Sequence, residues 1–595
     1  MIANTILHRL LENGRVRPNA PAYYAKSDDL WIPTTWQEYV AQVRQAARAL
    51  ISLGLEPGGC VCILGFNRPE WSIFNLASML AGGHSAGIYA SNSPTEVKYV
   101  FNHSEAKIIL LENEKQWQKV HLVRDQLPRL KHVVVMKDSL IDDPLALDWD
   151  SFMTKGDEVG DQLLEARLSG LRMDQLATLI YTSGTTGPPK GVMLSHENLV
   201  WTAEQGLKLF KITPADSLLS HMPLSHIAEQ MFTIHTAVMA GFQVYYAQYP
   251  PQKHLNYNFR EVSPTIVFTV PRVWERFASG IKAALAESSG IKAVIAEWAL
   301  RVGKQVSTLK NRGLKPSRVL AVRHKLASQL VYNNVKKALG FSRARHCLTG
   351  AAPIAPEIVE FFHNLDFPLL EIYGQSEVCG PSTVNRHGAN KIGSVGQAWP
   401  GTKVRLAEDG EILVKGPNVF MGYYKNPEAT ANDLVDDWLH TGDIGQFDEE
   451  GFLTIIGRKK EIIITSGGLN VAPKNIEASL MNLPLISQAV CIGDNRRYIT
   501  AVVTLNAEVT SKFAKERALE GHDLHAHPAV IEAVQKGIDE EVNAHLSRGE
   551  QVRDFRILSR DFTLEDGELT PTMKIKRRVV NEHFAAEIES MYRVK

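Results

Sequence analysis

Short apolar runs that alternate with helical patterns are the feature that most constrains the fold of this chain. The run CVCIL at 60–64 is followed by GFNRPEW, by a helical pattern that begins near Pro69, and by SAGIY at 85–89. The runs KIILL at 107–111 and HVVVM at 132–136 are further short apolar runs of the same kind. A proline near the first position of a helix and short apolar runs are typical of strand–helix–strand units. Such units predict a mostly parallel sheet with helices on both faces.

The length of the chain predicts more than one domain. Single hydrophobic cores stop growing at roughly 250 to 300 residues, and this chain has 595. Its 65 basic and 65 acidic residues cancel, so no global field would recruit nucleic acid. Residues 1–18 mix polar and apolar side chains, which argues against a cleaved signal peptide, and no window offers ~18 uninterrupted apolar residues. We expect a soluble protein that is cytoplasmic or peripheral on a membrane.

The five cysteines are scattered and fit a reducing cytoplasm. Cys60 and Cys62 alternate along one predicted strand, so they share a face with small hydrophobic residues. No second pair of cysteines is present to complete a zinc site.

The stretch YTSGTTGPPKGV at 181–192 has the local chemistry of a phosphate-binding loop. Its hydroxyl and glycine residues are Thr182, Ser183, Gly184, Thr185, Thr186 and Gly187. Glycines let the backbone approach an anion, hydroxyls donate to its oxygens, and Lys190 supplies a positive charge. The motif differs from the common nucleotide P-loop, because proline and not glycine precedes the lysine. A flexible surface loop is the alternative. The flanking residues predict a strand at 176–181 and a helix capped by Ser195.

Two further stretches read as strands that run into loops. They are CLTGAAPI at 347–354 and LLEIYGQSE at 369–377. Ligands in open α/β sheets bind outside the carboxyl ends of the strands, where these loops would lie. KVRLAEDGEILVKG at 403–416 predicts a hairpin with Asp409 and Gly410 in its turn.

Residues 301–346 contain twelve lysines and arginines and no acidic residue. One interpretation is a solvated helical face. The other is an electrostatic contact with anionic lipid or with the phosphates of CoA.

These motifs, in this order, resemble the AMP-forming adenylating enzymes, the superfamily of acyl-CoA synthetases, luciferases and peptide-synthetase adenylation domains. The matching stretches are YTSGTTGPPKGV, YGQSE, DWLHTGDIG, IIGRKKE and LTPTMKIKR. PLSHI, VPRVWERF and the basic segment are most similar to long-chain fatty acid CoA ligases of the bubblegum-like group. The resemblance implies an α/β fold with a large multi-layer N-terminal domain of mostly parallel sheets and a β-structured subdomain at 1–457. It also implies a hinge at 458–460 and a small mobile α+β domain at 461–595.

The resemblance also implies roles for individual residues. The phosphate loop with Lys190 would bind ATP, Glu377 would hold magnesium, and Lys574 would be the catalytic lysine. His226 would line the acyl site, and Lys460 would be the hinge. The other expected nucleotide contacts are Gly350, Ala351 and Ala352, then Tyr373, Gly374, Gln375 and Ser376, and finally Asp443 and Arg458 for the ribose. Ser376 stands where threonine is common and keeps the hydroxyl.

The implied reaction is the ATP-dependent activation of a long-chain fatty acid to acyl-CoA through an acyl-adenylate, with Mg²⁺ as cofactor and CoA as co-substrate. A fatty acid is already ionised at neutral pH, so no general base is needed. Two alternatives stay open: an enzyme of the same fold that acts on an aryl or other carboxylic acid, and a non-catalytic relative that binds acyl groups or nucleotides. The sequence carries no signal for acyl chain length or for oligomeric state.

Overall fold

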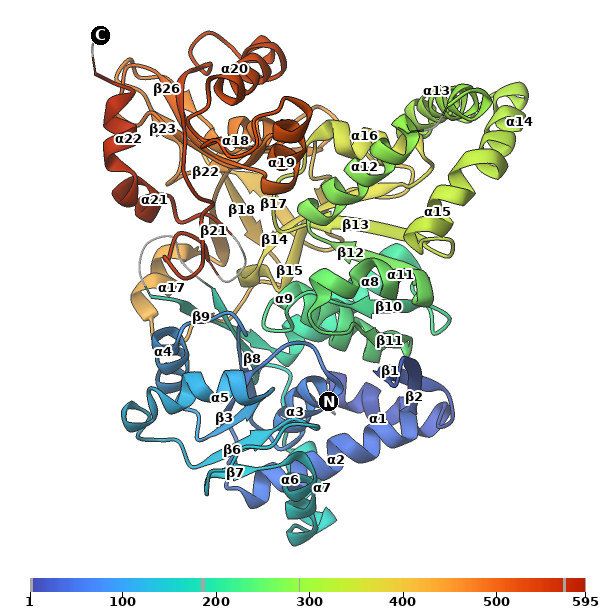
Figure 1. Cartoon of the computed structure of the whole chain (residues 1–595). Helices are drawn as coiled ribbons and strands as arrows, with labels where there is room; N and C mark the ends of the chain where they lie inside the picture. The colour runs from blue at the N-terminus through green and yellow to red at the C-terminus, as the bar shows by residue number, and fades with distance from the viewer. Residues whose placement is uncertain (1–3, 183–187, 288, 571–573, 594–595) are drawn as a thin grey trace.

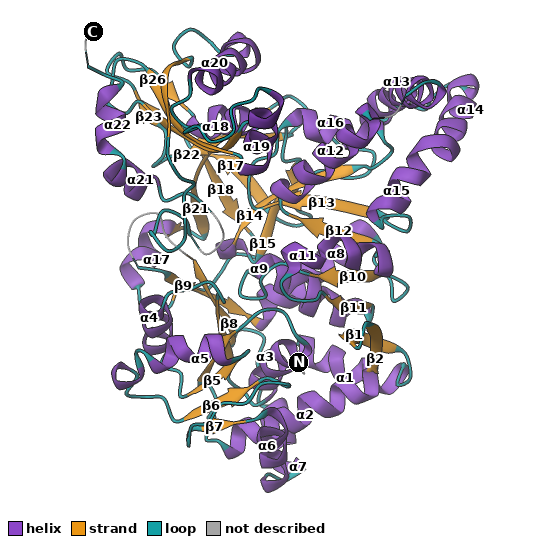
Figure 2. Ribbon diagram, viewed as in Figure 1, coloured by secondary structure: helices purple, strands orange, loops and turns teal. Residues whose placement is uncertain are grey.

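The computed structural model of the protein describes residues 4–182, 188–287, 289–570 and 574–593. Two large sheets and their helices form the lower and right-hand parts of Figure 1, and a smaller C-terminal unit, in red, lies at the upper left. Figure 2 shows strands enclosed by helices throughout the large domain. No helix among the described residues is long and apolar enough to cross a bilayer.

The first large sheet has eight strands, and six of them run parallel. In spatial order its strands are β19 (Gly422–Tyr423), β9 (Lys190–Ser195), β8 (Leu176–Thr182), β4 (His84–Ile88), β3 (Cys60–Leu64), β5 (Ile108–Leu111), β6 (His132–Val135) and β7 (Ala146–Leu147). Cys60 and Cys62 pack in one core, and Val61 and Ile63 in another. The predicted alternation of this strand is therefore confirmed, and both cysteines are free and buried.

The second large sheet has nine strands and also a parallel centre. In spatial order its strands are β16 (Gln397–Ala398), β15 (Gly380–Val384), β14 (Leu369–Gln375), β13 (His346–Gly350), β12 (Ile266–Thr269), β10 (Ser217–Ser220), β11 (Gln243–Tyr246), β1 (Pro21–Ser27) and β2 (Leu30–Thr35). Antiparallel strands close the sheet at both ends.

Helices and sheets alternate in five layers, as the strand–helix–strand pattern predicts. The outer face of the first sheet packs on α4 (Pro94–Ser104) and α5 (Glu114–His121). The layer between the sheets contains α2 (Trp36–Ser52), α3 (Pro69–Leu80) and α8 (His196–Phe210). The outer face of the second sheet packs on α12 (Pro271–Ala286), α13 (Ile291–Asn311) and α16 (Pro356–Asn364).

A five-stranded sheet follows the two large ones and confirms the predicted β-structured subdomain. It contains β17 (Lys403–Leu406), β18 (Glu411–Lys415), β20 (Leu434–Val435), β21 (Trp438–Phe447) and β22 (Leu453–Arg458). The predicted hairpin is formed by β17 and β18, with Gly410 at a positive φ of 83° in its turn.

The C-terminal unit is a small α+β structure. Its three-stranded sheet contains β25 (Ile486–Ile492), β26 (Ile499–Leu505) and β27 (Val552–Ile557). One face of this sheet packs on α18 (Pro473–Met481) and α20 (Pro528–Gly537), and the other on α21 (Arg577–His583) and α22 (Ala585–Ser590).

Two helical glycines on the outer layer differ in the space around them. A Cβ atom built on Gly303, in α13, would lie 1.8 Å from the carbonyl oxygen of Asn364 at the end of α16. A Cβ atom on Gly280, in α12, would meet nothing within 4 Å. The close approach of α13 to α16 therefore depends on glycine at 303.

We predict opposite effects for alanine at these two glycines. Gly303→Ala should lower the free energy of unfolding by about 1 to 3 kcal/mol, because the helices must separate. Gly280→Ala should raise it by up to ~1 kcal/mol, since alanine favours a helix. Thermal unfolding of both variants checks the packing, and equal melting temperatures for the two would contradict it.

Candidate active site

The loops that follow β13 and β14 lie at the carboxyl edge of the second sheet, where a ligand is expected. Gly350 ends β13, and Ala351 has a positive φ of 67°, which is uncommon for a residue with a Cβ. Ala351 and Ala352 are exposed. A Cβ on Gly374 would lie 1.7 Å from the carbonyl oxygen of Gly380, so this strand turns back too tightly for any side chain. The edge offers exposed backbone in a strained loop.

Asp443 connects the second sheet with the β-structured subdomain. The Tyr373 hydroxyl, on β14, donates to its carboxylate at 2.7 Å. Arg458, its partner in the β21–β22 register, contacts the same carboxylate at 2.9 Å. Burial raises the pKa of Asp443, and the charge of Arg458 opposes that rise. Gln375 adds a longer bond to the Thr441 carbonyl, at 3.4 Å. The structure therefore brings together three residues that the sequence separates by up to 85 positions, the difference between 458 and 373.

Glu377 is buried in a short 3-10 turn (Ser376–Val378) directly after β14. The hydroxyl of Tyr423, on β19, lies 2.9 Å from the Glu377 carboxylate and 2.9 Å from the carboxylate of Asp433. Asp433 ends α17 (Pro427–Asp433) and contacts the ammonium of Lys190 at 3.2 Å. That ammonium also lies 4.2 Å from the centre of the Tyr423 ring. One chain of contacts therefore joins Lys190 to Glu377.

The electrostatics of this chain of contacts fit a divalent cation at Glu377. A tyrosine hydroxyl has one proton to donate, and here two carboxylates compete for it. Burial raises the pKa of Glu377, and the negative charge of Asp433 adds to the rise. A cation bound by carboxylate oxygen would remove the penalty on the ionised form, and oxygen is the ligand that Mg²⁺ prefers. No cluster of three or more His, Cys, Asp or Glu among the described residues forms a metal site by itself, so the phosphates of a nucleotide would have to complete the coordination.

The phosphate-binding stretch begins at the end of β8. Thr182 pairs with Lys190 across β8 and β9, and its hydroxyl lies 3.5 Å from the Lys190 carbonyl. Ser183, Gly184, Thr185, Thr186 and Gly187 lie outside the described residues. The expected order of strand, loop and helix needs a correction, because β9 stands between the loop and α8. Ser195 caps α8 as predicted, but the helix begins at the far end of β9 from the loop.

His226 caps the short helix α9 (Ile227–Gln230), and its environment fixes the state of its ring. Nδ1 accepts the backbone N–H of Ala228 at 3.2 Å. The proton of the neutral ring therefore sits on Nε2, which is left as a donor. Burial, together with the charge of Lys574, lowers the pKa of His226 to about 4. The ring is neutral at pH 7 and close enough to Lys574 to feel its charge.

Lys574 comes from the C-terminal unit and reaches the same region. Its charge acts on His226 and on Asp443, both in the large domain. The residue as a whole is exposed, yet partial loss of water around the ammonium lowers its pKa, and the charge of Arg458 adds to this effect. Residues 571–573, which precede it, lie outside the described residues. Lys460 lies in the exposed turn that follows β22.

Sequence reasoning did not identify Tyr423 and Asp433 as site residues. Tyr423 belongs to the stretch FMGYYKNPEAT at 420–430. Tyr423 reaches Glu377 because β19 pairs with β9, more than 220 positions away along the chain. No local periodicity encodes that pairing, so no signal within the stretch itself could have revealed the contact.

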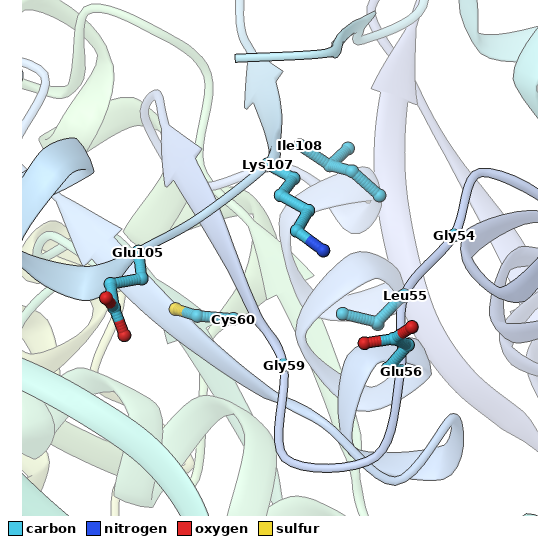
Figure 3. Close-up of a pocket in the computed structure, with 8 residues that line it drawn as sticks. All are labelled: Gly54, Leu55, Glu56, Gly59, Cys60, Glu105, Lys107 and Ile108. Carbon is cyan, nitrogen blue, oxygen red and sulfur yellow. The ribbon is translucent and has the colours of Figure 1, made fainter. Parts of the chain in front are cut away.

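A small pocket of about 40 Å³ lies elsewhere, between the loop at 54–59 and the start of β5 (Figure 3). Cys60 and Ile108, which line it, are the first residues of β3 and β5. The pocket is therefore at the amino ends of these parallel strands, on the opposite edge from the expected ligand site. Its volume suits a water molecule and not a nucleotide.

Comparison with known proteins agrees with this geometry. Residues 10–424 match the model for AMP-binding enzymes, and residues 460–595 match the model for the AMP-binding enzyme C-terminal domain. The chain is 40% identical to the long-chain-fatty-acid–CoA ligase ACSBG2 of Xenopus laevis, over 96% of this chain and 81% of that protein. It is 37% identical to the long-chain-fatty-acid–CoA ligase FadD15 of Mycobacterium bovis, over 98% and 96%.

Among solved structures, the anthranilate CoA ligase AuaEII in complex with anthranoyl-AMP superposes with a TM-score of 0.71. The superposition covers 99% of both chains at 19% identity, which establishes the fold alone. The sequence matches establish the family as well as the fold, because they cover most of the chain at 35–40% identity. The protein belongs to the family of AMP-binding enzymes.

Proposed function

We propose that the protein joins a long-chain fatty acid to CoA at the expense of ATP. The carboxylate attacks the α-phosphorus of ATP, and the bond to pyrophosphate breaks, which leaves an acyl-adenylate. The CoA thiol then attacks the acyl carbon and AMP departs. The observation that carries the proposal is the placement of Glu377 and of the Asp443–Arg458 pair at the carboxyl edge of the second sheet, where the charge of Lys574 acts on Asp443. The named activity of the relatives at 35–40% identity supports the fatty acid.

The two alternatives are less well supported. An aryl acid is named for solved structures such as the anthranilate ligase, but these are about 20% identical and share only the fold. A non-catalytic relative would have no need of a buried carboxylate beside Tyr423 or of a lysine brought to Asp443 from another domain. A fatty acid ligase would use both the buried carboxylate of Glu377 and the charge of Lys574.

The residues of the site would neutralise two anions that repel each other. A carboxylate and a triphosphate must approach closely, and fixed positive charges lower the barrier to that approach. We propose that Lys190, once released from Asp433, and Lys574 supply two of these charges. Mg²⁺ on Glu377 would act as a Lewis acid on the phosphate oxygens. The neutral Nε2–H of His226 would donate to the reacting carboxylate or phosphate without adding charge.

We propose domain boundaries at 1–457 and 461–595, with a hinge at 458–460. Strand β22 ends at Arg458, and an exposed turn follows before the first strand of the C-terminal unit, β23 (Ile463–Ile464). A turn that carries few buried side chains can absorb a rotation between domains at low cost. In the present arrangement the charge of Lys574 acts on Asp443, which would suit adenylation. CoA transfer would then follow a rotation about Lys460.

The first test is fatty-acid-dependent exchange of pyrophosphate into ATP. We expect exchange with a long-chain acid and none with anthranilate or benzoate. Glu377→Gln keeps the shape of the side chain and removes its charge, so the exchange rate should fall by ~10² or more while ATP binding changes less. Asp437→Asn, on an exposed turn of the subdomain, is the control. Exchange at the wild-type rate in Glu377→Gln would exclude the magnesium assignment.

The second test separates the two half-reactions. Lys574→Ala should slow acyl-adenylate formation by ~10² to 10³, equivalent to ~3 to 4 kcal/mol, and leave thioester formation from supplied acyl-adenylate almost unchanged. Lys460→Pro should do the reverse, because proline fixes φ near −65°. Lys576→Ala and Lys460→Ala are the matched controls. Equal losses in both half-reactions, for either Lys574→Ala or Lys460→Pro, would contradict a domain alternation centred on these residues.

We also propose a peripheral contact between the enzyme and anionic membranes. Four of the twelve cations in 301–346 are neutralised by acidic residues from other segments: Lys304 by Glu360, Lys310 and Lys336 by Asp366, and Arg345 by Asp216. Within the described residues, the cations of α14 (Arg318–Ala327) form no ion pair. They are Arg318, Arg323 and Lys325. We take this helix as the candidate contact, because it carries three such cations on one exposed element.

The exposed face of α14 supports a lipid partner. Val319, Val322 and Leu326 follow helical spacing, Leu330 continues the line, and all four are between 46% and 69% exposed. The helix projects from the molecule beside α13 at the upper right of Figure 1. An apolar stripe with cations on both sides is typical of helices that lie in the interface of an anionic membrane.

The charge and the stripe can be tested separately with vesicles. Replacing Arg318, Arg323 and Lys325 by Gln should weaken binding to phosphatidylserine-containing vesicles by up to about 100-fold, since each basic residue contributes ~1 kcal/mol near the surface. Replacing Lys512, Lys515 and Lys536, which are exposed on the C-terminal domain, is the charge-matched control. Val322→Glu should weaken binding even at high salt, because it removes an apolar contact. Binding that is absent, or equal in both triple variants, would favour a solvated helical face.

A further inference from the structure

The loop at 221–226 connects β10 in the second sheet to α9 and carries His226. It also lies against the first sheet. A Cβ atom on Gly87, in β4, would lie 2.9 Å from Cα of Ser225 and 3.1 Å from its Cβ. Any larger residue at 87 would therefore push the loop away. The loop is held in a gap between two sheets, and a shift of the loop would move His226.

Asn67 binds this loop from the first sheet. It lies in the connection between β3 and α3 and is 1% exposed. Its Nδ2 donates to the carbonyl of Met222 at 2.6 Å, and its Oδ1 accepts the backbone N–H of Leu224 at 2.9 Å. A side-chain amide that bonds two backbone groups two residues apart fixes both the position and the direction of the segment between them.

Glu229, on α9, bonds the residue that precedes the loop. The carboxylate is 2% exposed and accepts Ser220 Oγ at 2.6 Å and Thr233 Oγ1 at 2.8 Å. Asn67 Nδ2 lies 3.2 Å from the same oxygen. The backbone amides of His221 and Met222 are near enough to this carboxylate to oppose the rise of its pKa. Glu229 thus holds the start of the loop, Asn67 holds its middle, and the two side chains contact each other.

No step of the proposed reaction uses Asn67 or Glu229. Burial of an acidic side chain such as Glu229 is unfavourable, so its presence here calls for a role that compensates for the cost. Burial raises the pKa of Glu229 to about 7 despite its donors. A purely structural connection between β10 and α9 could use apolar residues at lower cost. Asn67 bonds the backbone of the loop, and Glu229 bonds both Asn67 and Ser220, the residue before the loop, which points to control of the loop geometry.

We propose that Asn67 and Glu229 are positioning residues that hold His226 in place for the adenylation step. The inference rests on the proposed function, because it assigns these side chains to the same reaction. Both would act through the loop that carries His226. Asn67 comes from one sheet and Glu229 from the helix that follows the other, so the pair also fixes His226 relative to both large sheets.

The test uses the full-length enzyme and compares two buried asparagines. Asn75→Ala is the matched control, because Asn75 is also fully buried and its Nδ2 donates to Ser85 Oγ at 2.6 Å, away from the loop. Asn67→Ala should lower kcat for pyrophosphate exchange at least tenfold and leave the KM for ATP within twofold. Asn75→Ala should lower the melting temperature by about as much as Asn67→Ala does, but it should leave the exchange rate within twofold of wild type.

A double-mutant cycle shows whether Asn67 acts through His226. If it does, Asn67→Ala combined with His226→Ala should be no slower than His226→Ala alone, because the positioned group is already absent. Losses that multiply would overturn the proposal, and so would an exchange rate in Asn67→Ala equal to that of Asn75→Ala. Glu229→Gln keeps the shape and weakens the acceptor, so it provides the same cycle if Asn67→Ala does not fold. Absence of exchange in the wild type would instead refute the proposed function.

Discussion

The carboxylate of Asp443 is the point through which three parts of the molecule meet. It accepts Tyr373 from the second large sheet and pairs with Arg458 at the end of the subdomain sheet. Arg458 is also two residues before Lys460, where the chain leaves for the C-terminal unit. Because a buried carboxylate must keep its partners, the sheet edge, the subdomain and the proposed hinge share one constraint. The charge of Lys574 reaches the same carboxylate from the other domain.

The parts of this arrangement that depend on local pattern could be predicted from the sequence. Strand β3 alternates as CVCIL suggests, α3 begins at Pro69, and the YGQSE stretch covers the last three residues of β14 and the turn at its carboxyl end. The contacts that complete the site depend on distant pairings. Strand β9 enters between the phosphate loop and its helix because it pairs antiparallel with both β8 and β19, and the second of these pairings brings Tyr423 to Glu377.

The charges of the basic segment at 301–346 also depend on distant contacts that the local sequence does not reveal. A count of charges along 301–346 gives twelve cations and no acidic residue, yet acidic residues from α16, its C-terminal turn and the start of β10 neutralise four of them. Lys336 is largely buried beside Asp366 and could not reach a membrane surface. In the part of the chain that the structure describes, α14 combines cations that form no ion pair with exposed valines and leucines. Exposure is a tertiary property that composition does not contain.

Each large sheet supplies a different half of the proposed site. The two sheets must therefore keep a fixed position relative to each other if these residues are to stay aligned. The first sheet carries Thr182 and Lys190, and the second carries Tyr373 and Glu377. Apolar packing between them, as in the layer of α2, α3 and α8, resists separation but tolerates small slides. Hydrogen bonds do not tolerate such slides, because their geometry is directional. Polar links from one sheet to the other, Tyr423 to Glu377 and Asn67 to the His226 loop, lie where a slide would misalign the residues of the proposed site.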